Sequence, residues 1–241
     1  MDMDQRQRLQ VGADPYHLWC SLMGIGAFIN NAVGGRLIDA DAPNLMLKEK
    51  RSVTTVLHQI AGSSPYGSAA ALTVEGEHPV VFWQADFPVC ILRAYQSGRS
   101  WTYGLWCDAP IGSVIQVLIF DDAHEVSVPG AYGIETYNAS ARRTWALRGK
   151  PLIVRGFGGN DELPANLPAG RSYAMGSVRG CLRWVYYERR ATIYLWSSYM
   201  NGAQPIIRDP IYQTGTSPPG QDYGQGSWPL PIWAIADVTG Y

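Results

Sequence analysis

The feature that most constrains the fold of this chain is a series of short strand-like runs separated by glycine, proline or asparagine. In each run, β-branched and aromatic residues recur at about every second position. A period of two is typical of a strand whose successive side chains face opposite sides of a sheet. The clearest runs cover residues 52–60, 79–83, 89–95, 100–106, 113–120, 133–137, 181–188, 191–196 and 232–238.

No convincing amphipathic helix accompanies these runs in the sequence. The good helix formers at 44–51 make only a short stretch beside strand-like sequence, which favours strand over helix there. Several short strands spaced by turn residues are typical of β-sandwiches. We therefore predict an all-β fold of antiparallel, β-sandwich-like units with long loops and little or no helix.

The chain of 241 residues is long enough for one large β domain or for several smaller units. We divide it into an N-terminal β-hairpin segment (1–70), a β-sandwich domain (71–155) and a C-terminal β-rich segment (156–241). Within the last segment, 183–196 predicts a tight hairpin that turns at 188–190 and carries bulky residues on both faces.

Residues 197–231 differ from the strand-like runs, because glycine, proline, serine and asparagine are frequent there. Pro218-Pro219-Gly220 and Gly224-Gln225-Gly226 are expected to interrupt any strand, which predicts a long loop over 197–231. Tryptophan and tyrosine faces stack on sugars and pack against proteins, although they would equally anchor the loop on its own domain. The candidate contacts with a partner or receptor are Tyr199, Tyr212, Tyr223 and Trp228.

Charge and hydropathy narrow the partners that we expect. The net charge is −1 at pH 7, which gives no basic surface for nucleic acid. Every apolar run is too short for a membrane span, and residues 1–8 do not resemble a signal peptide. We therefore expect synthesis in the cytoplasm without secretion by a signal peptide. Charged residues are only 16% of the chain, so we expect partner proteins to cover much of the surface.

The cysteines and histidines show no pattern typical of a metal or redox site. Cys20, Cys90, Cys107 and Cys181 lie far apart among apolar neighbours, which predicts reduced, buried thiols. The histidines fall on separate segments without metal-ligand spacing, at positions 17, 58, 78 and 124. We predict neither a metal site nor a cofactor.

For two acidic pairs, the sequence favours a structural role over cation binding or catalysis. Asp39-Ala40-Asp41 begins like a calcium loop, but it lacks that loop's later glycine and glutamate. Asp121-Asp122 ends a strong apolar strand and would suit a cation or a glycosidase acid, yet strand-end turn chemistry is favoured. We predict no catalytic residues and a protein that is not an enzyme.

The segment Asn138-Ala139-Ser140 matches the N-glycosylation pattern but also suits the corner of a hairpin. It belongs to a weak internal repeat. Residues 24–39 followed by 44–47 resemble residues 133–145 followed by 151–154: each copy reads as a strand, an asparagine-led turn, a strand and a short apolar strand. Asparagine tolerates positive φ and bonds back to the backbone, so we predict a hairpin corner at Asn138 rather than a sugar acceptor.

This repeat resembles a pattern of small minor tail proteins at the tail tip of long-tailed bacteriophages, G-[IL]-x-x-[YF]-N-x-S-x-x-x-x-[FW] followed by [PN]-L-x-[VL]. Residues 74–81, 101–103, 108–121 and 233–240 are also similar to stretches of such proteins. The resemblance covers most of residues 20–155. The chain departs from it at Ala141, where the usual turn glycine is missing, and in residues 197–231.

The resemblance implies a structural virion protein of the phage tail tip or baseplate. Such a protein would assemble as a homo-oligomer, such as a trimer, and with other tail-tip proteins, and would support host attachment. A second hypothesis is a carbohydrate-binding or host-receptor-binding β-domain that contacts a bacterial surface receptor or glycan through the aromatic residues of 197–231. A third is a glycan hydrolase whose two acids the sequence does not pair.

Overall fold

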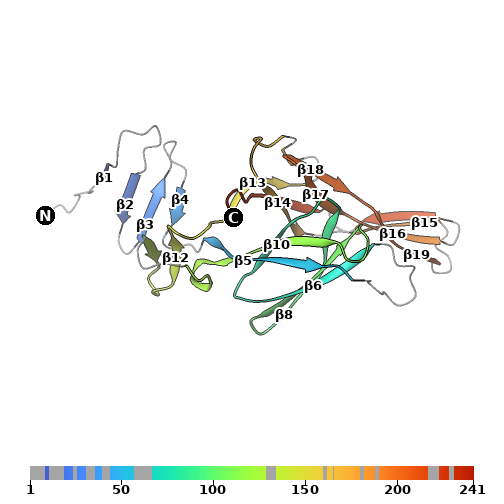
Figure 1. The fold of residues 1–241 in the computed structure, drawn as a ribbon, viewed down its shortest axis with the longest axis horizontal. Coiled ribbons are helices and arrows are strands. Elements are labelled where there is room, and N and C mark those ends of the chain that lie inside the picture. The colour runs from blue at the N-terminus through green and yellow to red at the C-terminus, as the bar shows by residue number, and fades with distance from the viewer. Residues whose placement is uncertain are drawn as a thin grey trace. The chain divides into compact units, whose positions relative to one another are not determined.

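The computed structural model describes residues 9–10, 19–23, 26–30, 36–39, 44–56, 67–128, 134–159, 162–164, 166–179, 182–187, 190–216, 223–227 and 231–241. Side chains are described from residue 44 onward, except those of 179, 182–187, 190, 191, 193, 211–216 and 223–227. Within these ranges the chain forms antiparallel strands and one short 3-10 helix (Figure 1). The predicted all-β, sandwich-like fold with little helix is confirmed.

Eight of the nine predicted runs coincide with a strand to within about two residues, but the run 52–60 overlaps its strand only at 52–54, and the strands at 68–75 and 173–179 were not predicted. In chain order the elements are β1 (Leu9–Gln10), β2 (Trp19–Met23), β3 (Gly26–Asn30), β4 (Arg36–Asp39), β5 (Leu45–Thr54), β6 (Ser68–Glu75), β7 (Val80–Gln84), β8 (Val89–Ser97), β9 (Ser100–Cys107), β10 (Val114–Asp122), η1 (Ala123–Glu125), β11 (Glu135–Tyr137), β12 (Arg143–Ala146), β13 (Ile153–Gly158), β14 (Tyr173–Arg179), β15 (Leu182–Tyr187), β16 (Arg190–Leu195), β17 (Ser197–Asn201), β18 (Gln204–Arg208), β19 (Ile211–Thr216), β20 (Tyr223–Ser227) and β21 (Ile232–Asp237).

Contacts group the chain into two compact units, each built from two separate segments. Unit 1 contains residues 1–48 and 120–152, and unit 2 contains residues 49–119 and 153–241. This grouping interleaves the two units along the chain, whereas the division expected from the sequence was sequential. The three-part division of the sequence stays a prediction.

Unit 2 contains a β-sandwich made of two antiparallel sheets. One sheet has the order β13-β21-β14-β7-β10-β5, and the other has the order β18-β17-β8-β9-β6. Alternate residues of the facing strands supply one apolar core, as the period of two predicts. The core includes Leu72 and Val74 of β6, Leu105 of β9, and Val117 and Ile119 of β10.

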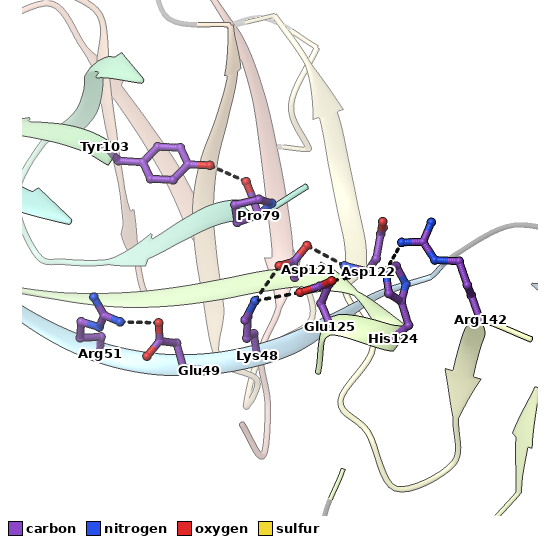
Figure 2. A network of polar contacts seen from close by, with 10 residues as sticks. All are labelled: Lys48, Glu49, Arg51, Pro79, Tyr103, Asp121, Asp122, His124, Glu125 and Arg142. Carbon is purple, nitrogen blue, oxygen red and sulfur yellow. Dashed lines mark hydrogen bonds and ion pairs between the residues drawn. The ribbon is translucent and has the colours of Figure 1, made fainter. Parts of the chain in front are cut away.

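Two hydrogen bonds of unit 2 satisfy polar atoms inside this sandwich. The Trp83 indole Nε1–H of β7 donates to the Ser198 carbonyl of β17 at 3.0 Å and so joins the two sheets. The Tyr103 hydroxyl of β9 donates to the Pro79 carbonyl at 2.5 Å (Figure 2). Both aromatic rings are buried, so each ring fills the core while its polar atom keeps a partner.

Unit 1 shows why the sequence repeat exists. β3 pairs with β4, and β11 pairs with β12, so each copy of the repeat contains an antiparallel hairpin. The short apolar segments that follow the two hairpins pair with each other. The Leu152 amide donates to the Leu45 carbonyl at 2.8 Å, the Leu47 amide donates to the Lys150 carbonyl at 2.7 Å, and Met46 bridges Pro151. Leu45 and Leu152 occupy equivalent places in the two copies, so the copies meet at matching residues.

The corner of the second hairpin confirms the structural interpretation of Asn138. Its side-chain Oδ1 accepts hydrogen bonds from the backbone amides of Ser140 at 3.0 Å and Arg142 at 2.9 Å. Ala141 has φ +59°, the left-handed conformation that favours glycine. Ala141 therefore holds a backbone conformation that glycine adopts at lower cost.

The first hairpin's corner, beginning at Asn31, lies outside the described residues. Four further features named above also lie outside the described residues: His17, His58, Pro218-Pro219-Gly220 and Trp228.

The prediction of a long loop at 197–231 is wrong, because β17, β18, β19 and β20 all lie within it. Glycine at Gly224 and Gly226 does not interrupt β20, which pairs through these residues with Tyr186 and Trp184. β20 lies at one edge of the sheet β19-β16-β15-β20, and an edge strand tolerates the weak strand propensity of glycine better than a central one. The predicted hairpin of 183–196 is confirmed by the pairing of β15 with β16.

Candidate functional site

The structure distributes the predicted contact residues over three strands. Tyr199 lies half-buried in β17 of the five-stranded sheet. Tyr212 belongs to β19 and Tyr223 to β20, and these strands form the two opposite edges of the four-stranded sheet. Trp228 lies outside the described residues. The strand order therefore separates Tyr212 from Tyr223, and Tyr199 belongs to another sheet.

A cleft in unit 2 is a candidate site. Its volume is about 620 Å³, within the range of sites that bind small molecules or side chains. It is lined by residues 79–81 at the start of β7, 90–94 of β8, Tyr103 of β9, 177–178 of β14 and 195–196 between β16 and β17. Most of these side chains are apolar.

The cleft follows the edge of β8. Five successive residues of this strand line it, and successive strand residues point to opposite sheet faces. Tyr103, beside them, belongs to the core between the sheets, whereas Cys90 packs with Leu195 in a smaller cluster. The cleft therefore reaches the strand from both of its faces, as only a space along an edge does.

Strand pairing shows the same open edge. On one side β8 pairs with β9 along its whole length, from Val89 with Cys107 to Ser97 with Ser100. On its other side, the pairing in the described residues is limited to Val89 with Ser198 of β17. A bulge between Ile91 and Arg93 interrupts the ladder. Residues 91–97 thus present backbone amides and carbonyls to which the described chain adds no further strand.

Two buried polar atoms in the cleft have no hydrogen-bond partner within the described part of the molecule. They are the Trp196 indole Nε1 and the Ser177 hydroxyl Oγ, which belong to residues of the lining but are themselves buried. Most buried polar atoms of native proteins are paired, and an unpaired one costs about 1–3 kcal/mol. Trp196 offers only a donor, whereas Ser177 can donate or accept. Because both atoms are buried, a hydrogen-bond acceptor placed in the cleft reaches them only after the side chains around them shift.

A single cation marks the rim. Arg93 is exposed, and the described residues provide no ion pair for its guanidinium. The lining contains no aspartate or glutamate. The Tyr103 hydroxyl is already engaged by Pro79 (Figure 2). The cleft therefore combines an apolar wall with a positive rim and two unused polar atoms.

The sequence did not indicate this site, because its residues come from five separate strands or connections. Trp196 was placed only at the end of a strand-like run, and Ser177 lies in a segment without a motif. The alternation of apolar residues in 89–95 predicted the strand itself. It could not predict which edge of β8 stays open, since that depends on the distant strand β17.

The carboxylate of Asp121, the first residue of the pair Asp121-Asp122, is held by contacts within the chain. The buried Asp121 carboxylate accepts from Lys48 Nζ at 2.9 Å and from the Asp122 amide at 2.9 Å (Figure 2). Lys48 also lies 3.7 Å from Glu125. These contacts neutralise Asp121 where β10 passes into η1.

Asp237 is the second buried carboxylate with a full set of partners. Its oxygens accept from Arg171 at 2.6 Å, from Arg155 at 3.1 and 3.2 Å, and from the Thr239 hydroxyl at 2.7 Å and amide at 3.2 Å. Burial by itself would raise the pKa of Asp237, but the hydrogen bonds from Thr239, Arg171 and Arg155 lower this pKa to about 2. The ionised Asp237 carboxylate therefore holds the end of β21 through these hydrogen bonds.

The described cysteines agree with the prediction of reduced, buried thiols. Cys90 and Cys107 are free and buried, and burial raises the pKa of the Cys107 thiol. The side chains of Cys20 and Cys181 lie outside the described residues.

Comparisons of the chain with protein-family models, with curated proteins and with solved structures find no match. In the described part of the chain, no helix has the length and apolar character that a membrane crossing requires.

Proposed function

We propose that this chain is a non-enzymatic structural protein of a bacteriophage tail tip or baseplate, located in the virion. In this role it assembles with copies of itself and with other tail proteins, and it supports host attachment. The hairpin-and-strand pattern of residues 20–155 supports the tail assignment by resemblance. The observation that carries the assembly role is the open edge of β8 beside an apolar cleft.

An open strand edge is a natural site of assembly, because its free backbone groups pair with a strand from another chain. Proteins that must stay unassembled block such edges with charges and bulges. β8 has only partial protection, from one arginine, Arg93, and the bulge beside it. This combination disfavours indiscriminate aggregation while it leaves the edge available to a specific partner.

The virion location is tested with purified phage particles. Tailed particles of the phage that encodes this chain are isolated on a density gradient, and their proteins are identified by mass spectrometry. Gold-labelled antibody against the chain should then mark one end of the tail in negative-stain images. Particles that contain the tail-tube protein but no trace of this chain would contradict the proposal.

A receptor-binding role is tested in parallel with an array of bacterial surface glycans. The assembly proposal expects no specific glycan signal from the purified chain. A signal that disappears on Trp228→Ala or Tyr199→Ala, with the fold intact, would support the carbohydrate-binding alternative instead.

A further inference from the structure

We infer that the cleft binds an extended segment of a partner polypeptide, which adds as a strand to the open edge of β8. The segment places an apolar side chain in the cleft, directs a backbone carbonyl at Trp196 and a carboxylate at Arg93. This inference rests on the proposed assembly function, which it makes specific by naming the chemistry of the partner.

The backbone of β8 is the first reason to expect a polypeptide. Residues 90–94 line the cleft, and 91–97 have no described partner strand on that side. A peptide strand offers amides and carbonyls at the spacing that such an edge requires. A sugar or a lipid chain would leave this ladder of backbone groups unpaired.

The two buried, unpartnered atoms next to the cleft are compatible with a polypeptide occupant. The Trp196 Nε1–H is buried without a partner and can only donate, so a backbone carbonyl of the occupant would pair with it once the surrounding side chains shift. The Ser177 hydroxyl can donate to a second acceptor or accept from an amide. A peptide backbone carries both kinds of group, and its carbonyls reach sites that its side chains do not fill.

The positive charge at the rim indicates which residues the bound partner segment contains. Arg93 carries a positive charge at the rim, and the lining residues bring no acidic side chain to neutralise it. The other lining side chains are largely apolar, with exposed Val178 at the cleft as well. The complementary strand therefore alternates apolar residues with polar ones and contains an aspartate or glutamate.

The inference is tested with the full chain and a set of fluorescein-labelled peptides. Each short peptide alternates valine and threonine, and one aspartate is moved through successive positions. Fluorescence polarisation should detect binding of at least one peptide. Replacing its aspartate with asparagine should weaken binding up to about fivefold, as expected for an exposed ion pair. Methylating its backbone nitrogens on one edge should weaken binding at least about tenfold, because strand pairing is then blocked.

Three variants locate the binding site. Arg93→Gln should remove the preference for aspartate over asparagine, whereas Arg208→Gln, an equal loss of charge at an exposed position of β18, should not. Ser177→Ala should weaken binding about fivefold, the value of one hydrogen bond. The same variant should not lower the melting temperature of the free chain, since the hydroxyl has no partner there. A hydroxyl with a purely structural role would lower it.

Nuclear magnetic resonance gives a readout that does not depend on variant stability. The indole N–H signal of Trp196, assigned by its loss in Trp196→Phe, should move on peptide addition, together with amide signals of 91–97. Three results would overturn the inference: no binding by any peptide at millimolar concentration, equal binding of N-methylated peptides, or signal changes confined to residues outside the cleft. Each result can occur while the chain is present in virions, so the two proposals fail separately.

Discussion

At the scale of single residues, one alanine shows how a local backbone requirement persists without its preferred side chain. Ala141 has φ +59° in the turn that Asn138 organises. An L-residue in this conformation costs about 1–2 kcal/mol, and glycine avoids that cost while losing some entropy in the unfolded chain. The turn is therefore locally strained, although the side chain and backbone of Asn138 hold it with hydrogen bonds.

We expect Ala141→Gly to raise the free energy of unfolding of the protein by about 0.5–1 kcal/mol. Urea denaturation followed by circular dichroism measures this change. Ala139→Gly is the matched control, because residue 139 does not have positive φ, and it should lower stability by about 0.5–1 kcal/mol. The same sign for both variants would contradict the interpretation.

Asp237 makes the stability of the chain depend on pH in the acid range. The folded pKa of about 2 lies below the ordinary value of 3.8, so the unfolded chain binds the proton first as the pH falls. The contribution of Asp237 is complete above about pH 5 and is lost as the pH falls towards 2. Because Arg155 and Arg171 are partly exposed, we expect only about 1–2 kcal/mol.

Urea unfolding at a series of pH values between 2 and 6 measures this loss. Asp237→Asn should be less stable than the native sequence at pH 6 and should lose less further stability on acidification. Asp108→Asn removes an exposed carboxylate and should leave the acid dependence unchanged. A slope in Asp237→Asn that equals the native slope would exclude Asp237 as its source.

At the scale of the elements, strand glycines differ according to what lies opposite them. A Cβ at Gly176 of β14 would lie 2.8 Å from the Phe82 ring, whereas one at Gly104 of β9 would lie 2.9 Å from the Arg93 Cγ. The Phe82 ring is buried, but the Arg93 side chain is exposed and flexible. The two contacts are similarly close, and the freedom of the neighbour decides their cost.

We expect Gly176→Ala to destabilise the protein by about 1–3 kcal/mol, because the packed ring must shift. Gly104→Ala should change stability by no more than about 0.5 kcal/mol, since Arg93 can move and alanine suits a strand better than glycine does. Shifts of the urea midpoint measure both effects. Equal losses in the two variants would show that side-chain mobility does not decide the cost.

The sequence predicted the elements far better than their arrangement. The alternation in 89–95 and 100–106 predicted β8 and β9, because a half-buried strand requires a period of two. The strands of 197–231 were missed. For β20, the reason is that glycine has a low strand propensity, as at Gly224 and Gly226, but the pairing of β20 with β15 outweighs this local preference. The cleft was missed for a related reason: Trp196, Ser177 and Arg93 are brought together only by pairing between distant segments.

At the scale of the whole molecule, pairing between distant segments also governs folding. β14 pairs with β7 through Met175 and Trp83, and β13 pairs with β21 through Ile153 and Asp237. Before such contacts form, long loops must close at a cost in chain entropy. This cost slows folding. The interleaved segments of the two units add further connections of the same kind.

We expect refolding from urea to take on the order of seconds or longer and to pass through an intermediate. Stopped-flow tryptophan fluorescence measures it, because Trp83, Trp106 and Trp233 are fully buried. Refolding in a single phase within a few milliseconds would contradict this expectation.

The position of Cys90 makes the accessibility of the open edge of β8 measurable by thiol alkylation. Cys90 is a 2% exposed residue, forms no disulfide, and belongs to the lining of the cleft. An alkylating reagent therefore reaches its sulfur only when local motion exposes it. Peptide mapping distinguishes the alkylation of Cys90 from that of Cys107. A strand seated along β8 would cover the sulfur, so the slowing of alkylation would report the fraction of the protein to which a partner is bound.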